Sequence, residues 1–223
     1  MKLLVVIPVY NEEANIVSVV EELRRVTPQY DFIIVSDGSR DATAQICKEH
    51  KWPIVEHEVN RGLTEAFRTG IRYAKEHGYE SVVQLDGDGQ HDPQYLPAME
   101  RMMEEEQCDI VIGSRFLNSG RPKNLRMLGN LMLSRKIRKK TGQMLTDPTS
   151  GMRMYDGRLF DRFLTEQSFG PEPDTIARLI FEGKKVRDVS VRMRERIEGH
   201  SYLRGIKPAK YMWHQLREIG RLK

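Results

Sequence analysis

The chain has 223 residues, of which 39% are hydrophobic. This is enough to fill one sizeable core, and two full domains are not expected. Lys and Arg outnumber Asp and Glu by 36 to 32, and basic residues dominate after Arg115. A basic half of this kind suits contact with phosphates or an anionic membrane surface. It contains no basic strand interleaved with aromatic residues and no recognition motif, so nucleic-acid binding is not expected.

The cysteines and the apolar runs indicate where the protein works. Cys47 and Cys108 are the only cysteines and form no CxxC pair, which argues against a disulfide framework or a thiolate metal site and fits a reducing cytoplasm. The apolar run after Lys2 is too short for a signal peptide, and no stretch reaches the roughly 18 apolar residues of a membrane span. If the protein works at a membrane, it lies on the inner face or is recruited by a separate membrane-protein partner.

Short β-rich runs alternate with amphipathic helical patterns in the first half, which is typical of βαβ units. We therefore predict an α/β fold with a Rossmann-like, mostly parallel central sheet flanked by helices. Strands are expected at 2–9, 31–36, 53–59, 81–85 and 108–116, with helices at 11–26, 61–78 and 93–106 and another helix capped by Ser39 or Asp41.

The pattern loosens after Arg115. The expected order is a polar loop at 117–126, a basic helix at 127–142, a turn-rich segment at 147–156 that leads into a short strand, a helix at 174–183, a strand at 184–193, a loop at 194–208 and a closing amphipathic helix. Residues after Arg115 are therefore expected to continue the same α/β fold.

The segment "LDGDGQHDP" (85–93) places Asp86 and Asp88 directly after a predicted buried strand. Ligands of open parallel sheets bind at the carboxyl ends of the strands. The glycines beside the two aspartates let the backbone turn both carboxylates toward one hard cation, and Mg²⁺ and Mn²⁺ prefer such oxygen ligands. Because Asp-Gly is also a common turn dipeptide, the pair alone does not decide between a turn and a metal site.

The strand ends taken together carry more information. "IPVYNEE", "SDGSRDAT", "NRGLTEAFRTG", "LDGDGQHDP", "GSRF" and "DPTSGMRMYD" follow one another in this order. In order and spacing they resemble the family 2 glycosyltransferases of the GT-A fold, and most of all the polyprenyl-phosphate or dolichol-phosphate mannose synthase group. The resemblance covers residues 2–202. It implies one GT-A domain over residues 1–205, with a nucleotide-binding half at 1–114 and an acceptor-binding half at 115–205, followed by the amphipathic helix at 206–223.

The resemblance also implies roles for residues on the donor side. Asp86 lies nearer the ribose and the metal, Asp88 binds the Mg²⁺ or Mn²⁺ that bridges the donor diphosphate, and Gln90 completes the metal shell. Ser36 departs from the usual "DDGS" pattern, and Gly87 stands where relatives usually have alanine. His91 supports the loop. The nucleotide pocket is lined by Pro8, Tyr10 and Glu12, with Asp37 accepting a hydrogen bond from the base.

On the acceptor side, the resemblance assigns the acceptor phosphate to Arg115 and Arg126. Arginine suits this task because its planar guanidinium group is always charged and bonds phosphate oxygens in pairs. The late segment "RIEGHSYLR" resembles a loop that closes over the donor diphosphate, in which Arg196 and Ser201 are the matching residues.

The acceptor class depends on whether a base is needed. A hydroxyl acceptor must lose a proton to a carboxylate, for which Asp147, Glu172 and Asp174 are candidates, whereas a lipid phosphate is already an anion. The two arginines favour a phosphate acceptor. Together with the resemblance, which implies inversion at the anomeric carbon, they lead us to expect a metal-dependent transfer of a hexose from a UDP- or GDP-sugar to a polyprenyl phosphate. A soluble transferase that acts on a hydroxyl of a cell-surface glycan and a non-catalytic sugar-nucleotide-binding protein are the alternatives.

The closing helix has two interpretations. Met212, Leu216, Ile219 and Leu222 form an apolar stripe flanked by basic residues. Such a stripe lies in the interface of a membrane surface, or it packs on the protein's own core or on another subunit.

Overall fold

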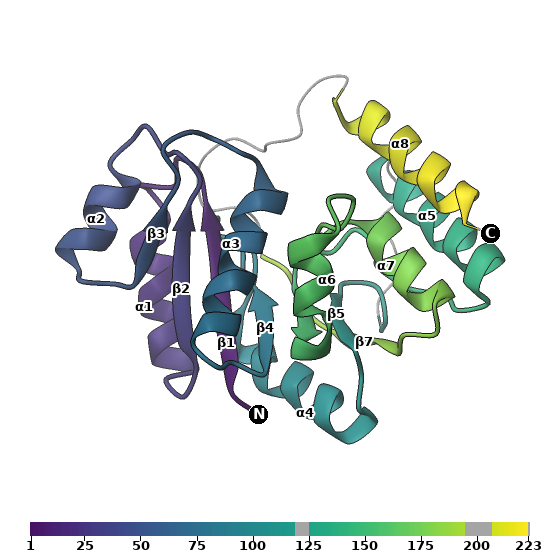
Figure 1. The fold of residues 1–223 in the computed structure, drawn as a ribbon, viewed down its shortest axis with the longest axis horizontal. Coiled ribbons are helices and arrows are strands. Elements are labelled where there is room, and N and C mark those ends of the chain that lie inside the picture. The colour runs from purple at the N-terminus through teal and green to yellow at the C-terminus, as the bar shows by residue number, and fades with distance from the viewer. Residues whose placement is uncertain (119–124, 195–206, 223) are drawn as a thin grey trace.

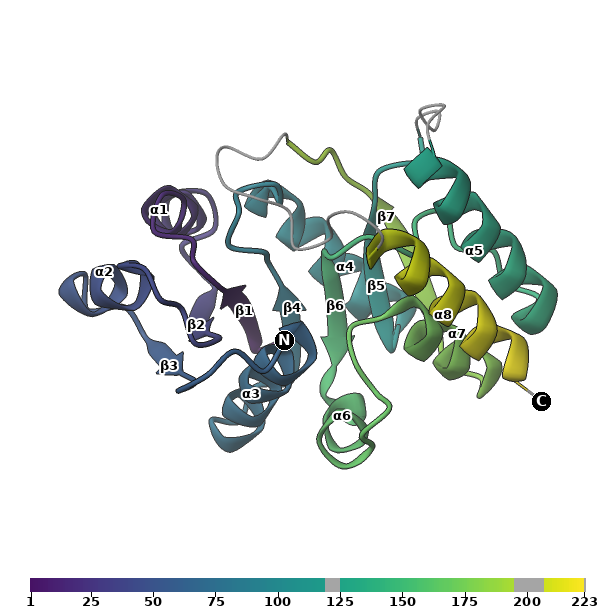
Figure 2. The ribbon, with the colours of Figure 1, turned by 90° about the horizontal axis from the view of Figure 1, so that it is seen from above.

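The computed structural model describes residues 1–118, 125–194 and 207–222, and their side chains except at 125–126 and 207–209. In this part of the chain, one seven-stranded sheet has the order β3-β2-β1-β4-β6-β5-β7 (Figures 1 and 2). Its strands are β1 (Leu3–Val9), β2 (Asp31–Ser36), β3 (Ile54–Glu56), β4 (Ser81–Gln84), β5 (Ile110–Ser114), β6 (Arg153–Asp156) and β7 (Val186–Ser190). The α-helices are α1 (Ile16–Val26), α2 (Thr43–Glu49), α3 (Leu63–Glu76), α4 (Leu96–Glu106), α5 (Leu125–Thr141), α6 (Phe160–Thr165), α7 (Pro173–Phe181) and α8 (Lys207–Arg221).

The predicted α/β fold with a mostly parallel sheet is confirmed. Every residue of β1 is buried, as expected of a central parallel strand covered by helices on both faces. Alternate β1 side chains enter two cores, with Leu4 and Val6 on one face and Val5 and Ile7 on the other. Helices α3, α5, α6, α7 and α8 contribute to the first core, and α1, α2 and α4 contribute to the second.

Strand β6 is the exception to the parallel pattern. It lies between β4 and β5 and is antiparallel to both, with Arg153 opposite Gln84 on β4 and Ile112 on β5. The amino end of β6 therefore lies beside the carboxyl ends of its two neighbours. As a result, the turn-rich segment that precedes β6 lies at the edge of the sheet where ligands are expected to bind.

The apolar stripe of α8 packs on the protein's own core. Ile219 is fully buried, and Met212, Leu216 and Leu222 pack against the same core. Lys140 at the end of α5 donates a hydrogen bond to the Leu222 carbonyl at 2.8 Å, and the figures show α8 alongside α5. The stripe is therefore not available to a membrane surface, and the second of the two interpretations is confirmed. Among the helices of the described segments, none has the length and apolarity to cross a bilayer.

Candidate active site

A cleft of about 490 Å³ opens at the carboxyl ends of β1, β2 and β4. This volume falls within the range of pockets that bind small molecules, about 300–1,000 Å³. The N-terminal end of α3 forms a further part of its wall. The lining includes the residues predicted to hold the nucleotide and the metal, namely Pro8, Tyr10, Glu12, Asp37, Asp86 and Asp88.

Asp37 is more constrained than the sequence suggests. Its carboxylate is buried and accepts hydrogen bonds from the backbone N–H groups of Arg61 at 2.9 Å and Gly62 at 2.7 Å. His57 Nδ1 lies 2.7 Å from the same carboxylate, and His57 Nε2 lies 2.9 Å from the Thr69 hydroxyl on α3. Asp37 therefore fixes the loop that leads into α3. A carboxylate has about four lone-pair sites, so a nucleobase would compete for the little capacity that remains.

Asp86 is held by two neighbours. Gln84 Nε2 donates to Asp86 Oδ1 at 2.7 Å, and the backbone N–H of Asp86 donates to His91 Nδ1 at 3.0 Å. Because a backbone N–H can only donate, Nδ1 is an acceptor, and the neutral His91 ring carries its proton on Nε2. His91 Nε2 lies 3.6 Å from Asp86 Oδ2. His91 thus supports the loop, as predicted, and Gln84 is a supporting residue that the sequence did not reveal.

Asp88 and Gln90 form a tight turn after this strand. Asp88 is buried, and its Oδ1 accepts the Gln90 backbone N–H at 3.0 Å. The Gln90 amide donates to the Arg194 carbonyl at 3.3 Å, and the Arg194 N–H donates to the Gln90 carbonyl at 3.0 Å. Gln90 is thus turned toward Arg194 and is not among the residues that line the cleft.

The two aspartates fit a Mg²⁺ or Mn²⁺ ion that also binds substrate. Among the described residues, no cluster of three or more His, Cys, Asp or Glu side chains forms a complete protein cage. Mg²⁺ usually binds through one or two carboxylates together with substrate phosphates and water. Asp86 and Asp88 line one cleft and supply that donor set.

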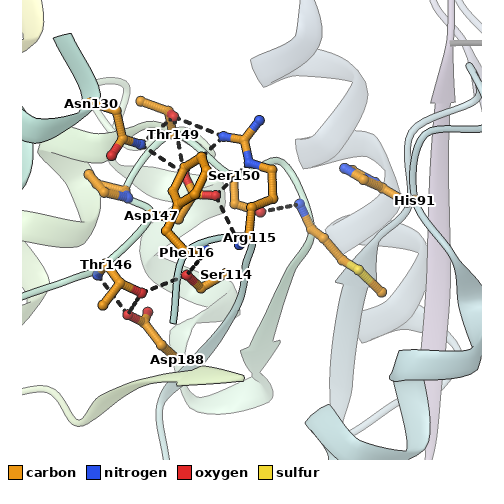
Figure 3. Close-up of polar contacts among 12 residues, drawn as sticks. His91, Ser114, Arg115, Phe116, Asn130, Thr146, Asp147, Thr149, Ser150 and Asp188 are labelled. Carbon is orange, nitrogen blue, oxygen red and sulfur yellow. Dashed lines mark hydrogen bonds and ion pairs between the residues drawn. The ribbon is translucent and has the colours of Figure 1, made fainter. Parts of the chain in front are cut away.

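Arg115 and Asp147, on the predicted acceptor side, form a bidentate ion pair (Figure 3). Arg115 Nε donates to Asp147 Oδ2 at 2.6 Å, and Arg115 Nη2 donates to Asp147 Oδ1 at 2.9 Å. Asp147 is completely buried and also accepts from Asn130 Nδ2 at 2.8 Å. Thr149 accepts further hydrogen bonds from Arg115 and Asn130. This geometry favours a role for Asp147 in positioning Arg115 over the role of a general base.

Gly151 joins the two sides of the site. A Cβ atom at this position would lie 2.8 Å from Asp86 Oδ2 and 3.1 Å from His91 Cε1. Real Cβ atoms essentially never come as close as the 2.8 Å distance to Asp86 Oδ2, and the absence of a side chain at Gly151 allows the turn to approach the aspartate loop. The turn that holds Arg115 through Asp147 is therefore in direct contact with the predicted metal site.

Three predicted residues lie beyond the described side chains. Arg126 is in the first turn of α5, but its side chain is not among those described. Arg196 and Ser201 lie outside the described residues. The described chain before them ends at Arg194, whose guanidinium group forms ion pairs with Glu22 at 2.6 Å and Asp92 at 2.5 Å. Arg194, the last described residue before this segment, is thus held beside the aspartate loop.

The other two candidate bases are half-buried at the start of α7. Glu172 accepts a hydrogen bond from the Tyr211 hydroxyl on α8. Burial raises the pKa of Glu172, although Tyr211 and Arg153 oppose the shift. Burial likewise raises the pKa of Asp174, whose Oδ1 accepts the Thr175 N–H at 2.9 Å. Both carboxylates are thus engaged by neighbouring groups within the predicted acceptor half.

Known proteins resemble this chain over most of its length. Residues 4–169 match the model of Glycosyl transferase family 2. The undecaprenyl-phosphate mannosyltransferase of Micrococcus luteus is 31% identical over 92% of this chain and 88% of its own. The UDP-N-acetylglucosamine–dolichyl-phosphate N-acetylglucosaminyltransferase of Methanococcus voltae is 32% identical over 81% of this chain and 79% of its own.

Solved structures extend the comparison to the fold. The crystal structure of glucosyl-3-phosphoglycerate synthase from Mycobacterium tuberculosis with phosphoglyceric acid has a TM-score of 0.74 and 21% identity, over 98% of this chain and 80% of its own. Another complex of that enzyme, with a TM-score of 0.70, contains Mn²⁺ and uridine diphosphate. The GT-A fold and the resemblance to polyprenyl-phosphate sugar transferases are thereby confirmed. The chain belongs to glycosyl transferase family 2.

Proposed function

We propose that the protein is a metal-dependent, inverting hexosyltransferase that moves a sugar from a UDP- or GDP-sugar to a polyprenyl phosphate. The observation that carries this proposal is the Arg115–Asp147 pair, which fixes an arginine on the acceptor side beside the Asp86 loop. The M. luteus relative, an undecaprenyl-phosphate mannosyltransferase, and the M. voltae relative, a dolichyl-phosphate N-acetylglucosaminyltransferase, support the acceptor class. The Mn²⁺ and uridine diphosphate bound by the M. tuberculosis enzyme support the donor class.

In the proposed reaction, an anionic oxygen of the acceptor phosphate attacks the anomeric carbon of the donor sugar. The bond from that carbon to the diphosphate breaks, the nucleoside diphosphate leaves with the bonding electrons, and the configuration inverts. A divalent cation held by Asp86 and Asp88 would stabilise the charge on the leaving diphosphate. Gln84 and His91 orient Asp86, while Asp147 holds the Arg115 guanidinium in position to bind and orient the acceptor.

The surroundings of the candidate bases favour a phosphate over a hydroxyl acceptor. Asp147 is completely buried and bonded to Arg115 and Asn130. A general base must come within hydrogen-bond reach of the proton that it removes, and the Asp147 carboxylate oxygens already accept hydrogen bonds from Arg115 and Asn130. Glu172 is engaged by Tyr211. A phosphate acceptor needs none of these carboxylates as a base.

A lipid-linked acceptor also requires contact with a membrane surface, which we assign to the cytoplasmic face. The outer side of α5 exposes Leu128 and Met132, and α8 exposes Trp213. Arg135 on α5 and Arg217 on α8 are exposed on the same two helices. Apolar and basic side chains together suit peripheral binding to anionic lipids, with or without a separate membrane-protein partner.

The proposal is tested by a donor screen that measures released nucleoside diphosphate and sugar-labelled lipid. UDP- and GDP-sugars are each supplied with Mg²⁺, Mn²⁺ or EDTA and with a short polyprenyl phosphate, the matching polyprenol or no acceptor. We expect transfer only to the phosphate, with loss of activity in EDTA and in Asp88→Asn, and unchanged activity in Asp161→Asn, which alters an exposed ion pair with Lys75. Equal transfer to polyprenol would overturn the phosphate assignment, and equal activity in EDTA would overturn the metal assignment.

A further inference from the structure

The Asp37 carboxylate has one accepting position left for a nucleotide. Its side chain is only 6% exposed, yet it lines the cleft. Oδ1 lies 2.7 Å from His57 Nδ1 and accepts the backbone N–H of Arg61 at 2.9 Å, while Oδ2 accepts the N–H of Gly62 at 2.7 Å. A carboxylate offers about four accepting positions, about two on each oxygen. Counting the groups of the described residues, Oδ1 is therefore saturated and Oδ2 keeps one position.

His57 is the side chain that completes the saturation of Asp37 Oδ1. An ionised carboxylate can only accept hydrogen bonds, so the proton between the two groups belongs to His57 Nδ1. The imidazole ring is buried, with 6% of the side chain exposed, and the Thr69 hydroxyl on α3 lies 2.9 Å from Nε2. The His57 backbone N–H donates to the Ser36 carbonyl at 2.9 Å. The ring is thus held at both nitrogens and keeps facing Asp37.

The loop between His57 and α3 packs closely against the turn that follows Asp37. A Cβ atom at Gly38 would lie 2.4 Å from the Asn60 backbone nitrogen and 2.4 Å from the Val59 carbonyl carbon. Two backbone N–H groups of the same loop bond the Asp37 carboxylate. The protein therefore sets the orientation of this carboxylate before a nucleotide binds, and the open position on Oδ2 is fixed in space.

Uracil and guanine make different demands on such a carboxylate. Uracil presents one N–H group on its pairing edge, at N3, between two carbonyl groups. Guanine presents two adjacent donors, N1–H and N2–H, which a carboxylate binds as a pair only when both of its oxygens are open. The open position of Asp37 satisfies the uracil edge, whereas it leaves one guanine donor without an acceptor on this carboxylate. A buried donor that lacks its acceptor lowers the affinity about tenfold.

We propose that His57 is a specificity-determining residue, which selects a uridine over a guanosine diphosphate donor by occupying Asp37 Oδ1. The inference rests on the proposed function and narrows its donor from two nucleotide classes to one. Its readout is the binding of the nucleoside diphosphate, which requires neither the sugar nor the acceptor.

The test is isothermal titration calorimetry of the full chain, with Mg²⁺ and separately with Mn²⁺. The ligands are UDP, GDP and UDP methylated at N3, which lacks the single N–H group. His57→Leu removes the donor to Asp37, whereas His57→Asn keeps an amide donor near the position of Nδ1. The matched control is His50→Leu, because His50 is exposed, stacks on Trp52 at a ring distance of 4.3 Å and does not line the cleft.

We expect wild type to bind UDP about tenfold more tightly than GDP and than N3-methylated UDP. His57→Asn and His50→Leu should keep the preference for UDP over GDP. His57→Leu should reduce that preference to about twofold or less, because Oδ1 is then open to a second guanine donor.

Equal or tighter binding of GDP by wild type overturns the inference and leaves the proposed sugar transfer intact, since either nucleotide can carry the sugar. Equal binding of UDP and N3-methylated UDP also overturns it, as does an unchanged preference in His57→Leu. If neither nucleotide binds, the inference and the proposed donor class both fail. If His57→Leu does not fold, Thr69→Val takes its place, because loss of the contact at Nε2 loosens the ring, and an unchanged preference in that variant overturns the role of His57.

Discussion

Asp147→Asn distinguishes two possible roles of the Asp147 carboxylate, namely positioning Arg115 and acting as a general base. The substitution keeps the size of the side chain but removes the charge that faces Arg115 Nε and Nη2. Removing one partner of a buried ion pair costs about 3–5 kcal/mol, because the other charge is left uncompensated. The Arg115 side chain is 20% exposed, whereas Asp147 is completely buried. Since Arg115 can turn partly toward water, we expect the lower end of that range, a loss of about 3 kcal/mol of unfolding free energy.

Urea unfolding measures the change in stability. The pH dependence of kcat/KM for polyprenyl phosphate measures the change in catalysis. If Asp147 positions Arg115, kcat/KM falls at every pH and the shape of the profile is kept. Asp161→Asn is the control, because its ion pair with Lys75 is mostly exposed and should contribute less than about 1 kcal/mol. The reasoning is refuted if Asp147→Asn costs less than about 1 kcal/mol, or if it removes the acidic limb of the profile, which would identify Asp147 as a base.

Two further predictions concern residues on the donor half. A Cβ atom at Gly87 would lie 2.5 Å from Val9 Cγ1, so Gly87→Ala should lower the unfolding free energy measured in urea by about 1–3 kcal/mol. Adding Val9→Ala to the same chain should restore part of that free energy, and strictly additive effects of the two substitutions would contradict the coupling. Burial raises the pKa of the Cys47 thiol from 9.0 to about 11. The thiol of the unfolded chain therefore loses its proton first, and this residue's contribution to stability falls as the pH rises from about 9.0 toward about 11. At pH 8, the Cys47 thiol should resist alkylation until urea unfolds the chain, and fast alkylation of native protein would count against burial.

The donor half was largely predictable because its signals are local. Parallel strands buried on both faces form continuous apolar runs, and "KLLVVIPV" and "DFIIVS" became β1 and β2 within a residue of the predicted bounds. The polar residues that follow these runs then meet at one edge of the sheet, as the rule for open parallel sheets requires. Asp37, Asp86 and Asp88 were found in one cleft for that reason.

The acceptor half was less predictable because its decisive contacts join distant segments. Arg115 and Asp147 are 32 residues apart, and nothing in either local pattern indicates that they pair. The position of β6 between β4 and β5 is set by backbone pairing, which the short run "RMYD" does not specify. Helix α6 at Phe160–Thr165 was not predicted, because its six residues are too few to show a clear helical period.

Helix α8 shows why an amphipathic pattern alone cannot identify what it packs against. The spacing of the apolar residues and the charges that flank them are the same whether the apolar stripe faces lipid or the protein's core. The hydrogen bonds of Tyr211 and Gln215 to the start of α7 decide the matter, because they require the stripe to face inward. Only the three-dimensional contacts contain this information.

The pairing of Arg115 with Asp147 also bears on how an anionic acceptor would be recognised. The pair is close to neutral as a unit, so it attracts a distant phosphate weakly. Its contribution is orientation, because a free arginine side chain has about 2 kcal/mol of rotamer entropy to lose on binding and Asp147 has already fixed the guanidinium group. The aspartate loop touches this turn at Gly151, so in the proposed reaction the same backbone would set the separation between Arg115 and the donor diphosphate. Under this proposal, the acceptor side contributes to the transfer through the geometry of this contact more than through net charge.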